Sequence, residues 1–299
     1  MGVRGWPEVF RGSDAVAAGL VTWGRLRGPR FVRIFPDIYA PAGDTPPDLE
    51  LRSRAAALLV EGRGAVSGYS AAELLGASCA PAGAPAEVTL FRGRQRAHPG
   101  LLVHRDRIAP GELTRVGDHE VTGPVRTAWD LARRLDPVEG VVAVDRLANA
   151  HRFNPDLLLN FLVHYRGARG NDRVPEVLAH AARYSGSPME SRLRMLLVGA
   201  GLPRPRVQWL VQDPVARTAV WIDLAYPEAM IGIEYEGEEH TTPEGVLRDA
   251  GRYTRLVDQG WRIYRYTKYE IHGEPRRIVD EIRRGLARAN GTSSQFVRG

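Results

Sequence analysis

The segment AVWIDLAYPEAMIGIEYEGEE, residues 219–239, decides how the last third of this chain folds. Apolar residues recur in two short runs, 219–226 and 230–236, and a proline-containing turn separates the runs. Alternating apolar and polar residues over runs of this length predict β-strands, and the short turn predicts that the two strands are neighbours. The segment therefore predicts the centre of a sheet that carries acidic side chains.

Three acidic residues lie within the two predicted strands. Side chains alternate between the faces of a strand, so Glu234 and Glu236 share one face of the second strand. If the turn has two residues, Asp223 pairs with Gly232 and lies diagonal to Glu234, at a Cα separation of ~7–8 Å. Carboxylates this close can hold one cation between them.

A helix predicted at 189–200 supplies a fourth acid. Glu190, Leu193 and Leu197 are spaced i, i+3 and i+7, so Glu190 projects from the apolar stripe of this helix. An inward-facing carboxylate without a partner takes up a proton instead of staying charged. Acids that converge at one end of a sheet are explained by a divalent cation. Taken alone, however, the acidic run 234–239 is better explained as a solvated sheet edge.

The other predicted elements complete an α/β unit that runs from residue 188 to the end of the chain. Periodicity and turn residues predict a helix, three strands, a helix, a strand and a final helix. The predicted ranges are 189–200, 207–212, 219–226, 230–236, 243–259, 261–266 and 275–289.

Five short motifs in this unit carry a resemblance to a known family. They are MESRL at 189–193, IDLAYP at 222–227, IEYEG at 233–237 followed by His240, Asp249 with Arg252, and GWRIYR at 260–265. With the order αβββαβα, they resemble the very-short-patch-repair (Vsr-like) branch of the PD-(D/E)XK nucleases. The resemblance implies a restriction-endonuclease-like core, DNA as the substrate and Mg²⁺ or Mn²⁺ as the cofactor.

The resemblance also implies a role for each acid. Asp223 and Glu234 would ligate the metal, and Glu190 would stand beside them and orient a water molecule. Glu236 would support a second ion or act as a base. It stands where the family motif has lysine, so the residue that usually orients the attacking water is absent.

Two further residues are candidates for catalysis in this unit. His240 could replace the missing lysine as general base because imidazole titrates near neutrality, although it is equally explained as a surface or metal-adjacent histidine. Arg252 could hold the scissile phosphate by a bidentate contact, but a structural pairing with Asp249 explains it slightly better.

Residues 8–41 predict two short helices followed by a hairpin. Ser13 and Thr22 are suitable N-cap residues for the helices, and apolar runs on both sides of Pro36 predict the hairpin. Helix, turn, helix and wing is the order of a winged helix-turn-helix. The second helix and the wing carry four arginines that are candidates for DNA contact; the alternative is a small helical module with solvated arginines. These residues are Arg25, Arg27, Arg30 and Arg33.

The amino-terminal half carries a second resemblance. Ala15 and Gly19 precede a wing that ends IYA at 38–40, and SGYSAAELLG at 67–76 and VTGPVRTAWDLA at 121–132 follow. These motifs resemble the abortive-infection type IV antitoxin family, which implies a winged helix that binds promoter DNA and an α/β domain that supports regulation. The predicted domains are 1–45 (winged helix), 46–152 (antitoxin-like α/β domain), 153–187 (helical connector) and 188–299 (nuclease-like domain).

The bulk composition is that of a globular protein, with 43% apolar and 25% charged residues among 299. A net charge of +6 hints at a polyanionic partner, but Lys268 is the sole lysine among 41 Lys and Arg, and such a general arginine bias weakens the hint. The single cysteine, Cys79, excludes an intramolecular disulfide and a cysteine-based zinc site. Apolar runs too short for a membrane span and the absence of a signal-peptide pattern predict a cytoplasmic protein.

Together these patterns predict a Mg²⁺-dependent DNA endonuclease with an amino-terminal DNA-binding module, acting in DNA repair or in defence against foreign DNA. The alternative is a non-catalytic DNA-binding regulator of antitoxin type. The intact acidic set favours the nuclease, and the missing lysine favours the regulator. A protein-interaction module has no positive signal in the sequence.

Overall fold

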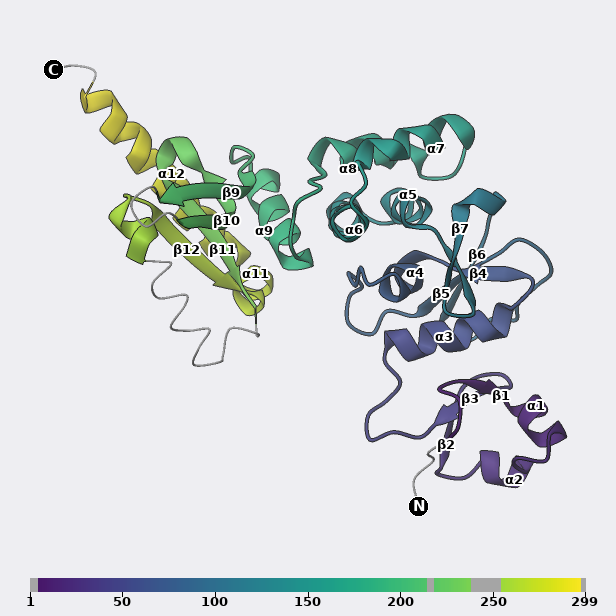
Figure 1. Cartoon of the computed structure of the whole chain (residues 1–299). Helices are drawn as coiled ribbons and strands as arrows, with labels where there is room; N and C mark the ends of the chain where they lie inside the picture. Colours follow the sequence, from purple (N-terminus) through teal and green to yellow (C-terminus); the bar gives the residue numbers. More distant parts are fainter. Residues whose placement is uncertain (1–4, 214–217, 238–253, 297–299) are drawn as a thin grey trace.

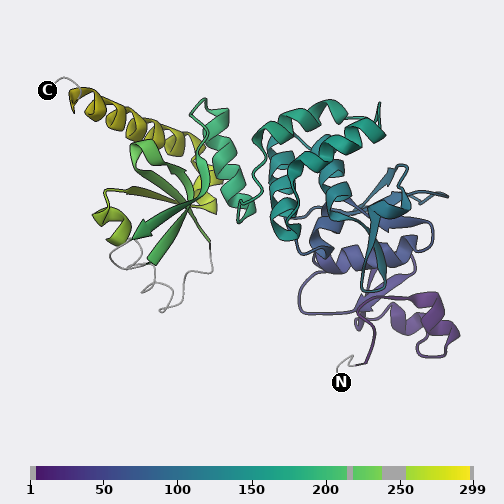
Figure 2. The same cartoon turned by 45° about the horizontal axis from the view of Figure 1, so that its top comes forward.

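The computed structural model describes residues 5–213, 218–237 and 254–296. These residues form helices and three sheets, which confirms the predicted mixed α/β class. Figure 1 shows the amino-terminal sheet next to the middle sheet, with the carboxyl-terminal sheet on the far side of α9. The turned view in Figure 2 keeps the last sheet apart from the other two. No described helix combines the length and apolarity that a membrane span requires.

The amino-terminal sheet has three strands in the order β1-β3-β2, with two short helices before β2. The Thr22 side chain accepts from the Arg25 amide and caps the second helix, as its residue type predicted. That helix is a single turn because Gly28 and Pro29, poor helix formers, follow it closely. The elements are β1 (Phe10–Arg11), α1 (Gly12–Ala17), α2 (Trp23–Leu26), β2 (Phe31–Phe35) and β3 (Ile38–Pro41).

The middle sheet has five strands in the order β6-β5-β4-β8-β7. Helix α3 packs between this sheet and the amino-terminal hairpin, since its buried alanines share a core with Phe35 and Val88. Three of the strands were not predicted, because runs of three or four residues are too short to show alternation. The elements are α3 (Leu49–Val60), β4 (Gly64–Val66), α4 (Gly68–Leu74), β5 (Ala86–Leu90), β6 (Leu101–Arg105), β7 (Leu113–Val116), β8 (His119–Thr122), α5 (Pro124–Arg134) and α6 (Pro137–His151).

The predicted helical connector forms two short helices, α7 (Leu158–His164) and α8 (Val174–His180). Both contribute to the core that includes Trp129 of α5 and Val141 of α6. The polar break predicted between them is present and ends in a 3-10 turn, Asn171–Arg173.

The carboxyl-terminal sheet has the strand order β12-β11-β10-β9, parallel between β11 and β12 and otherwise antiparallel. The helix predicted at 243–259 falls mostly outside the described residues; of its range, 254–258 are described and helical. The elements are α9 (Pro188–Gly199), β9 (Arg206–Asp213), β10 (Thr218–Tyr226), β11 (Ile231–Glu236), β12 (Arg262–Thr267), α11 (Lys268–Gly273) and α12 (Pro275–Phe296).

Both faces of this sheet are covered. Leu193 of α9 and Ile278 of α12 pack with Ile233 on one face. Ile222 packs with Leu256 and Trp261 in a separate core. The predicted apolar stripe of α9 therefore faces the sheet, and it carries Glu190 inward with it, 7% exposed.

The strand register differs from the prediction. Ala225, and not Asp223, pairs with Gly232, and the last pair of the β10–β11 ladder is Leu224 with Ile233. The connection is a 3-10 turn, Pro227–Ala229, followed by Met230 in the left-handed region, and this longer turn shifts the register. Extending this register by one step would set Asp223 opposite Glu234 and not diagonal to it, but the ladder ends before that pair.

Candidate active site

Two of the predicted acids meet at a glutamine where α9 faces the sheet. The side-chain amide nitrogen of Gln208 donates to Oε2 of Glu190 at 3.1 Å and to Oδ1 of Asp223 at 3.3 Å. Glu190 comes from the first turn of α9, Gln208 from β9 and Asp223 from β10. Three elements that are separate in sequence thus bring two carboxylates to one amide.

The start of α9 orients Glu190. Ser187 is the N-cap, and its hydroxyl accepts from the Glu190 amide at 3.2 Å. In return, Oε2 of Glu190 accepts from the Gly186 amide at 2.8 Å. These bonds hold the carboxylate at the helix start, where the helix dipole favours negative charge.

Gln208 and Asp223 lie opposite each other on β9 and β10. The ladder pairs Val207 with Leu224 and Trp209 with Ile222, on either side of them. Gln208 has a φ of 49°, an uncommon conformation for a residue other than glycine. On the other side of β10, Oδ2 of Asp223 accepts from the backbone amide of Tyr235 at 3.0 Å. Asp223 therefore joins β9, β10 and β11 at the point where β10 and β11 stop pairing.

The surroundings of Glu190 disfavour its charged form. Burial, and then the charge of Asp223, raise the pKa of Glu190 to about 7. The hydrogen bonds from Gly186, Ser187 and Gln208 lower that pKa but do not cancel the increase. Near neutral pH the protonated form of Glu190 is therefore more favourable than it is for an exposed glutamate.

The two acids of β11 have different surroundings. Glu234 is 4% exposed and follows Ile233, the last β11 residue that pairs with β10. Glu236 forms an ion pair at 3.0 Å with Arg265 of β12, and both side chains are more than one-third exposed. An exposed pair of this kind contributes little to stability.

No three acidic, histidine or cysteine side chains within the described residues form a compact metal-binding group. The structure brings Glu190 and Asp223 together, and Glu234 is buried in the neighbouring strand β11. Glu190 and Asp223 fit a Mg²⁺ ion, which commonly keeps several waters and takes one or two carboxylates. The predicted roles of His240 and Arg252 fall on residues outside those described.

No protein-family model matches the chain. Two curated relatives, uncharacterized protein MT2308 and uncharacterized protein Rv2248, come from two strains of Mycobacterium tuberculosis, CDC 1551 / Oshkosh and H37Rv. Each is 32% identical to this chain over 198 residues, which cover 66% of the chain and 72% of the relative. The chain belongs to the family of Rv2248. The crystal structure of RV2827C protein from M. tuberculosis has a TM-score of 0.40 and 16% identity, covering 72% of this chain and 87% of that one.

In this member of the Rv2248 family, the four predicted DNA-contacting arginines are all exposed. Arg25 lies in α2, Arg27 caps its carboxyl end, and Arg33 lies in β2. Arg30 lies in the turn between these elements. They are accessible to a polyanion, but the four-residue α2 offers only a short helical surface.

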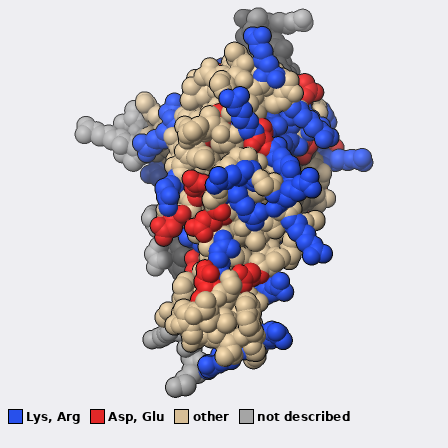
Figure 3. All heavy atoms as spheres, turned by 90° about the vertical axis from the view of Figure 1, so that its right-hand side faces the viewer, with Lys and Arg blue, Asp and Glu red and all other residues tan. Residues whose placement is uncertain are grey.

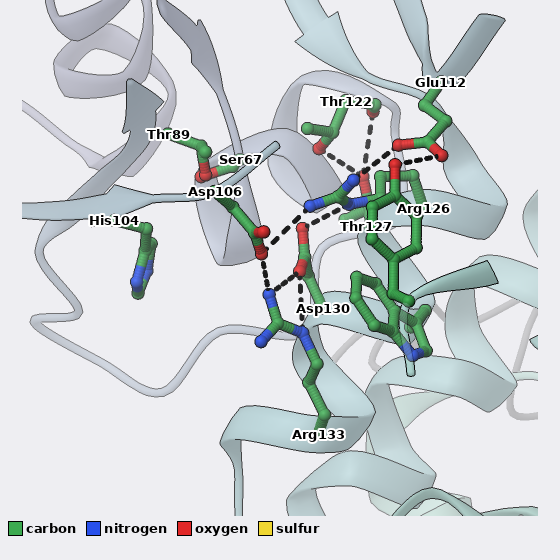
Figure 4. Close-up of polar contacts among 12 residues, drawn as sticks. Ser67, Thr89, His104, Asp106, Glu112, Thr122, Arg126, Thr127, Asp130 and Arg133 are labelled. Carbon is green, nitrogen blue, oxygen red and sulfur yellow. Dashed lines mark hydrogen bonds and ion pairs between the residues drawn. The ribbon is translucent and has the colours of Figure 1, made fainter. Parts of the chain in front are cut away.

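The motif at 121–132 contributes Arg126 and Asp130 to a buried ion network (Figure 4). Arg126 of α5 pairs with Asp130 at 2.9 Å and with Glu112 at 2.5 Å, while only 1% of its side chain is exposed. Arg133 pairs with Asp130 at 2.7 Å and with Asp106. Arg126 and Arg133 also lie 4.9 and 4.2 Å from the Trp129 ring centroid. These charges are matched by one another, so the network explains the motif as part of the core.

Sequence reasoning missed Gln208, the residue that joins the two acids. A single glutamine within an apolar run looks like an ordinary solvent-facing strand residue. The sequence offered one signal, which was the position of Gln208 in the strand that precedes Asp223. A polar side chain within a sheet usually needs a hydrogen-bond partner.

Proposed function

We propose that the protein is a metal-dependent endodeoxyribonuclease whose carboxyl-terminal unit has the PD-(D/E)XK fold. The observation that carries the proposal is the meeting of Glu190 and Asp223 at Gln208, one position beyond the end of the β10–β11 ladder. Glu190 is buried and Asp223 is half-buried, and neighbouring carboxylates in such surroundings concentrate at functional sites.

The arrangement of elements supports the fold assignment. Helix α9 is followed by three antiparallel strands, and β12 then returns parallel to β11. With the helical residues 254–258 between β11 and β12, the described elements agree with the order αβββαβα that the sequence motifs favoured, and α11 is an additional helix before α12. The Vsr-like identity rests on those motifs, since family membership with Rv2248 carries no assigned activity.

The roles follow from the positions of the side chains. Glu190, Asp223 and Glu234 would hold a Mg²⁺ or Mn²⁺ ion, which supplies phosphate polarisation and a more acidic water. Gln208 fixes the separation of the Glu190 and Asp223 carboxylates. The backbone amide of Tyr235 holds the second carboxylate oxygen of Asp223, Oδ2. Burial raises the pKa of Glu190 to about 7 in the chain without a cation, and a bound cation would favour its ionised form.

DNA affinity would come from the amino-terminal half, as a winged helix followed by the antitoxin-like α/β domain. Figure 3 shows Lys and Arg side chains gathered over the face that lies on the right of Figure 1. Exposed arginines also occur along the segment that contains β6 and β7, at Arg105, Arg107 and Arg115. Cations on one face provide the sequence-independent part of DNA binding.

The test is cleavage of plasmid and labelled oligonucleotides by the full chain in Mg²⁺, Mn²⁺ or EDTA. We expect cleavage with either metal and none in EDTA. Asp223→Ala should lower the rate at least about 100-fold, because a lost ligand removes several kcal/mol of barrier lowering. The matched control is Asp280→Ala, which removes an exposed acid paired with Arg283 on α12. Equal cleavage by the Asp223 and Asp280 variants would reject the proposal.

A second candidate function is a DNA-binding regulator without catalysis. The ion pair between Glu236 and Arg265 favours it, since the position of the motif lysine is occupied by an acid that already has a partner. Tight DNA binding with no cleavage under any metal condition would support this candidate and reject the nuclease.

A further inference from the structure

An aromatic pocket opens beside the Glu190–Gln208–Asp223 arrangement. Its described lining residues are Tyr184, Val207, Gln208 and Trp221, around a volume of 450 Å³. This size is within the range of small-ligand sites, about 300–1,000 Å³. Gln208 belongs both to the pocket wall and to the hydrogen bonds that hold the two carboxylates. A ligand in the pocket is therefore one side chain away from the candidate active site.

The two aromatic walls are unusually accessible. Tyr184 is 64% exposed and Trp221 is 53% exposed, whereas large aromatic side chains are mostly buried. Tyr184 lies in the segment before α9, and Trp221 lies in β10, two residues before Asp223. Two separate parts of the chain thus present aromatic rings at one pocket.

The chemistry of the walls suits a flat ring with polar edges. The Arg183 guanidinium lies 5.3 Å from the centroid of the Tyr184 ring and adds positive charge to this wall. The amide oxygen of Gln208 can accept a hydrogen bond from the edge of a bound ring. Nucleobases combine a π face with hydrogen-bonding edges, and they stack on tryptophan and tyrosine with little regard to sequence.

We propose that this pocket receives one unpaired nucleobase, and that the substrate class of the site is single-stranded or frayed DNA. The inference rests on the proposed nuclease function, because the phosphate beside the stacked base would be the one set against Glu190 and Asp223. A base inside a duplex is covered on both faces by its neighbours. It must be unstacked before it can reach Trp221, whereas a base in a single strand is already accessible.

Binding measured in EDTA tests the pocket separately from the chemistry. The full chain is titrated into a fluorescein-labelled single strand and into the matching blunt duplex, and fluorescence anisotropy gives both affinities. We expect the wild type to prefer the single strand. Trp221→Ala and Tyr184→Ala should each weaken single-strand binding about 5- to 150-fold, the effect of losing one stacked base. Duplex affinity should change less than about twofold, because a paired base does not enter the pocket.

Two control variants separate stacking from damage to the fold. Trp221→Phe keeps an aromatic ring and should retain most of the single-strand affinity. Tyr269→Ala removes another exposed aromatic side chain, 71% exposed on α11, and should leave the preference for single strands unchanged. Circular dichroism of each variant checks that the chain is folded.

The outcomes test the base pocket and the substrate class separately. Single-strand affinity that survives both alanine substitutions, or duplex affinity that falls equally, overturns the base pocket. A wild type that cuts duplex and single strand at equal rates in Mg²⁺ overturns the proposed substrate class. A preference for single strands in EDTA that depends on Trp221, without cleavage in any metal, supports the pocket and rejects the nuclease function.

Discussion

Removing the charge of Asp145 is expected to destabilise the chain through the helix that carries Glu190. Asp145 lies in α6 with 1% of its side chain exposed, and it pairs at 2.5 Å with Arg194 of α9, which is fully buried. Asp145 also accepts from the Ser191 hydroxyl at 2.6 Å and from the Ala182 amide at 2.6 Å. This network fixes α9 to the middle of the molecule, one residue away from Glu190.

The structure gives the magnitude for Asp145→Asn. The variant keeps the shape of the side chain but leaves the fully buried Arg194 guanidinium without a counter-charge. Breaking a buried pair in this way costs about 3–5 kcal/mol. Urea unfolding followed by circular dichroism measures this loss in the free energy of unfolding.

Two comparisons make this prediction specific. Glu139→Gln breaks a second ion pair between the same helices, with Arg192 at 2.7 Å, whose side chains are 26% and 16% exposed. Because Glu139 is 26% exposed, against 1% for Asp145, its loss should cost less than that of Asp145. Asp145→Leu combined with Arg194→Met removes both charges and should recover most of the loss. A cost for Asp145→Asn no larger than that of Glu139→Gln would show that the buried Arg194 does not require its counter-charge.

Three further predictions concern the candidate site, the amino-terminal arginines and the middle sheet. The pKa of Glu190 is about 7 in the folded chain against 4.5 ordinarily, so folding binds a proton and wild-type stability falls as pH rises through this window. Glu190→Gln removes that loss, and its stability relative to wild type should rise by on the order of 2–3 kcal/mol between about pH 4.5 and pH 8, by urea unfolding. Arg25→Ala with Arg27→Ala should flatten the salt dependence of DNA binding by roughly one unit of log–log slope per lost phosphate contact. Gly68→Ala should cost about 2–4 kcal/mol, because Gly68 has a φ of 57° and an added Cβ would lie 2.2 Å from Oε2 of Glu87.

Each of these predictions has an outcome that contradicts it. A pH-independent difference between Glu190→Gln and wild type would show that burial does not raise the Glu190 pKa. An unchanged salt slope would show that α2 and the turn after it serve packing or protein contacts. Gly83→Ala is the control for Gly68, since it has a φ of 77° but open space around the added atom, and an equal cost for both would remove the steric argument.

Strong periodicity made the carboxyl-terminal unit predictable from the sequence. The alternation through 219–236 placed β10 and β11, and the stripe of Leu193 and Leu197 placed Glu190 on the buried side of α9. The register was wrong because a single left-handed residue, Met230, lengthens the turn, and its side chain carries no signal for that conformation.

Roles that depend on partners distant in the sequence could not be predicted. Gln208 gained its role only when β9 was placed beside β10 and under α9, which no local pattern shows. Arg126 and Asp130 were recognised as part of a motif, but their burial depends on Glu112, which lies in a different element. The mixed α/β class could be predicted from local patterns, whereas the partners of the polar residues could be identified only in the folded chain.

The most direct test of the central claim is the affinity of the site for Mn²⁺, measured by titration calorimetry on the full chain. We expect a Mn²⁺ site in the wild type that Asp223→Asn abolishes and that Gln208→Leu weakens about 10- to 100-fold, because an orienting partner of the ligands is lost. The Asp280→Asn control should bind Mn²⁺ as the wild type does. Equal Mn²⁺ affinity in the wild type, Asp223→Asn and Gln208→Leu would contradict a metal site at Glu190 and Asp223.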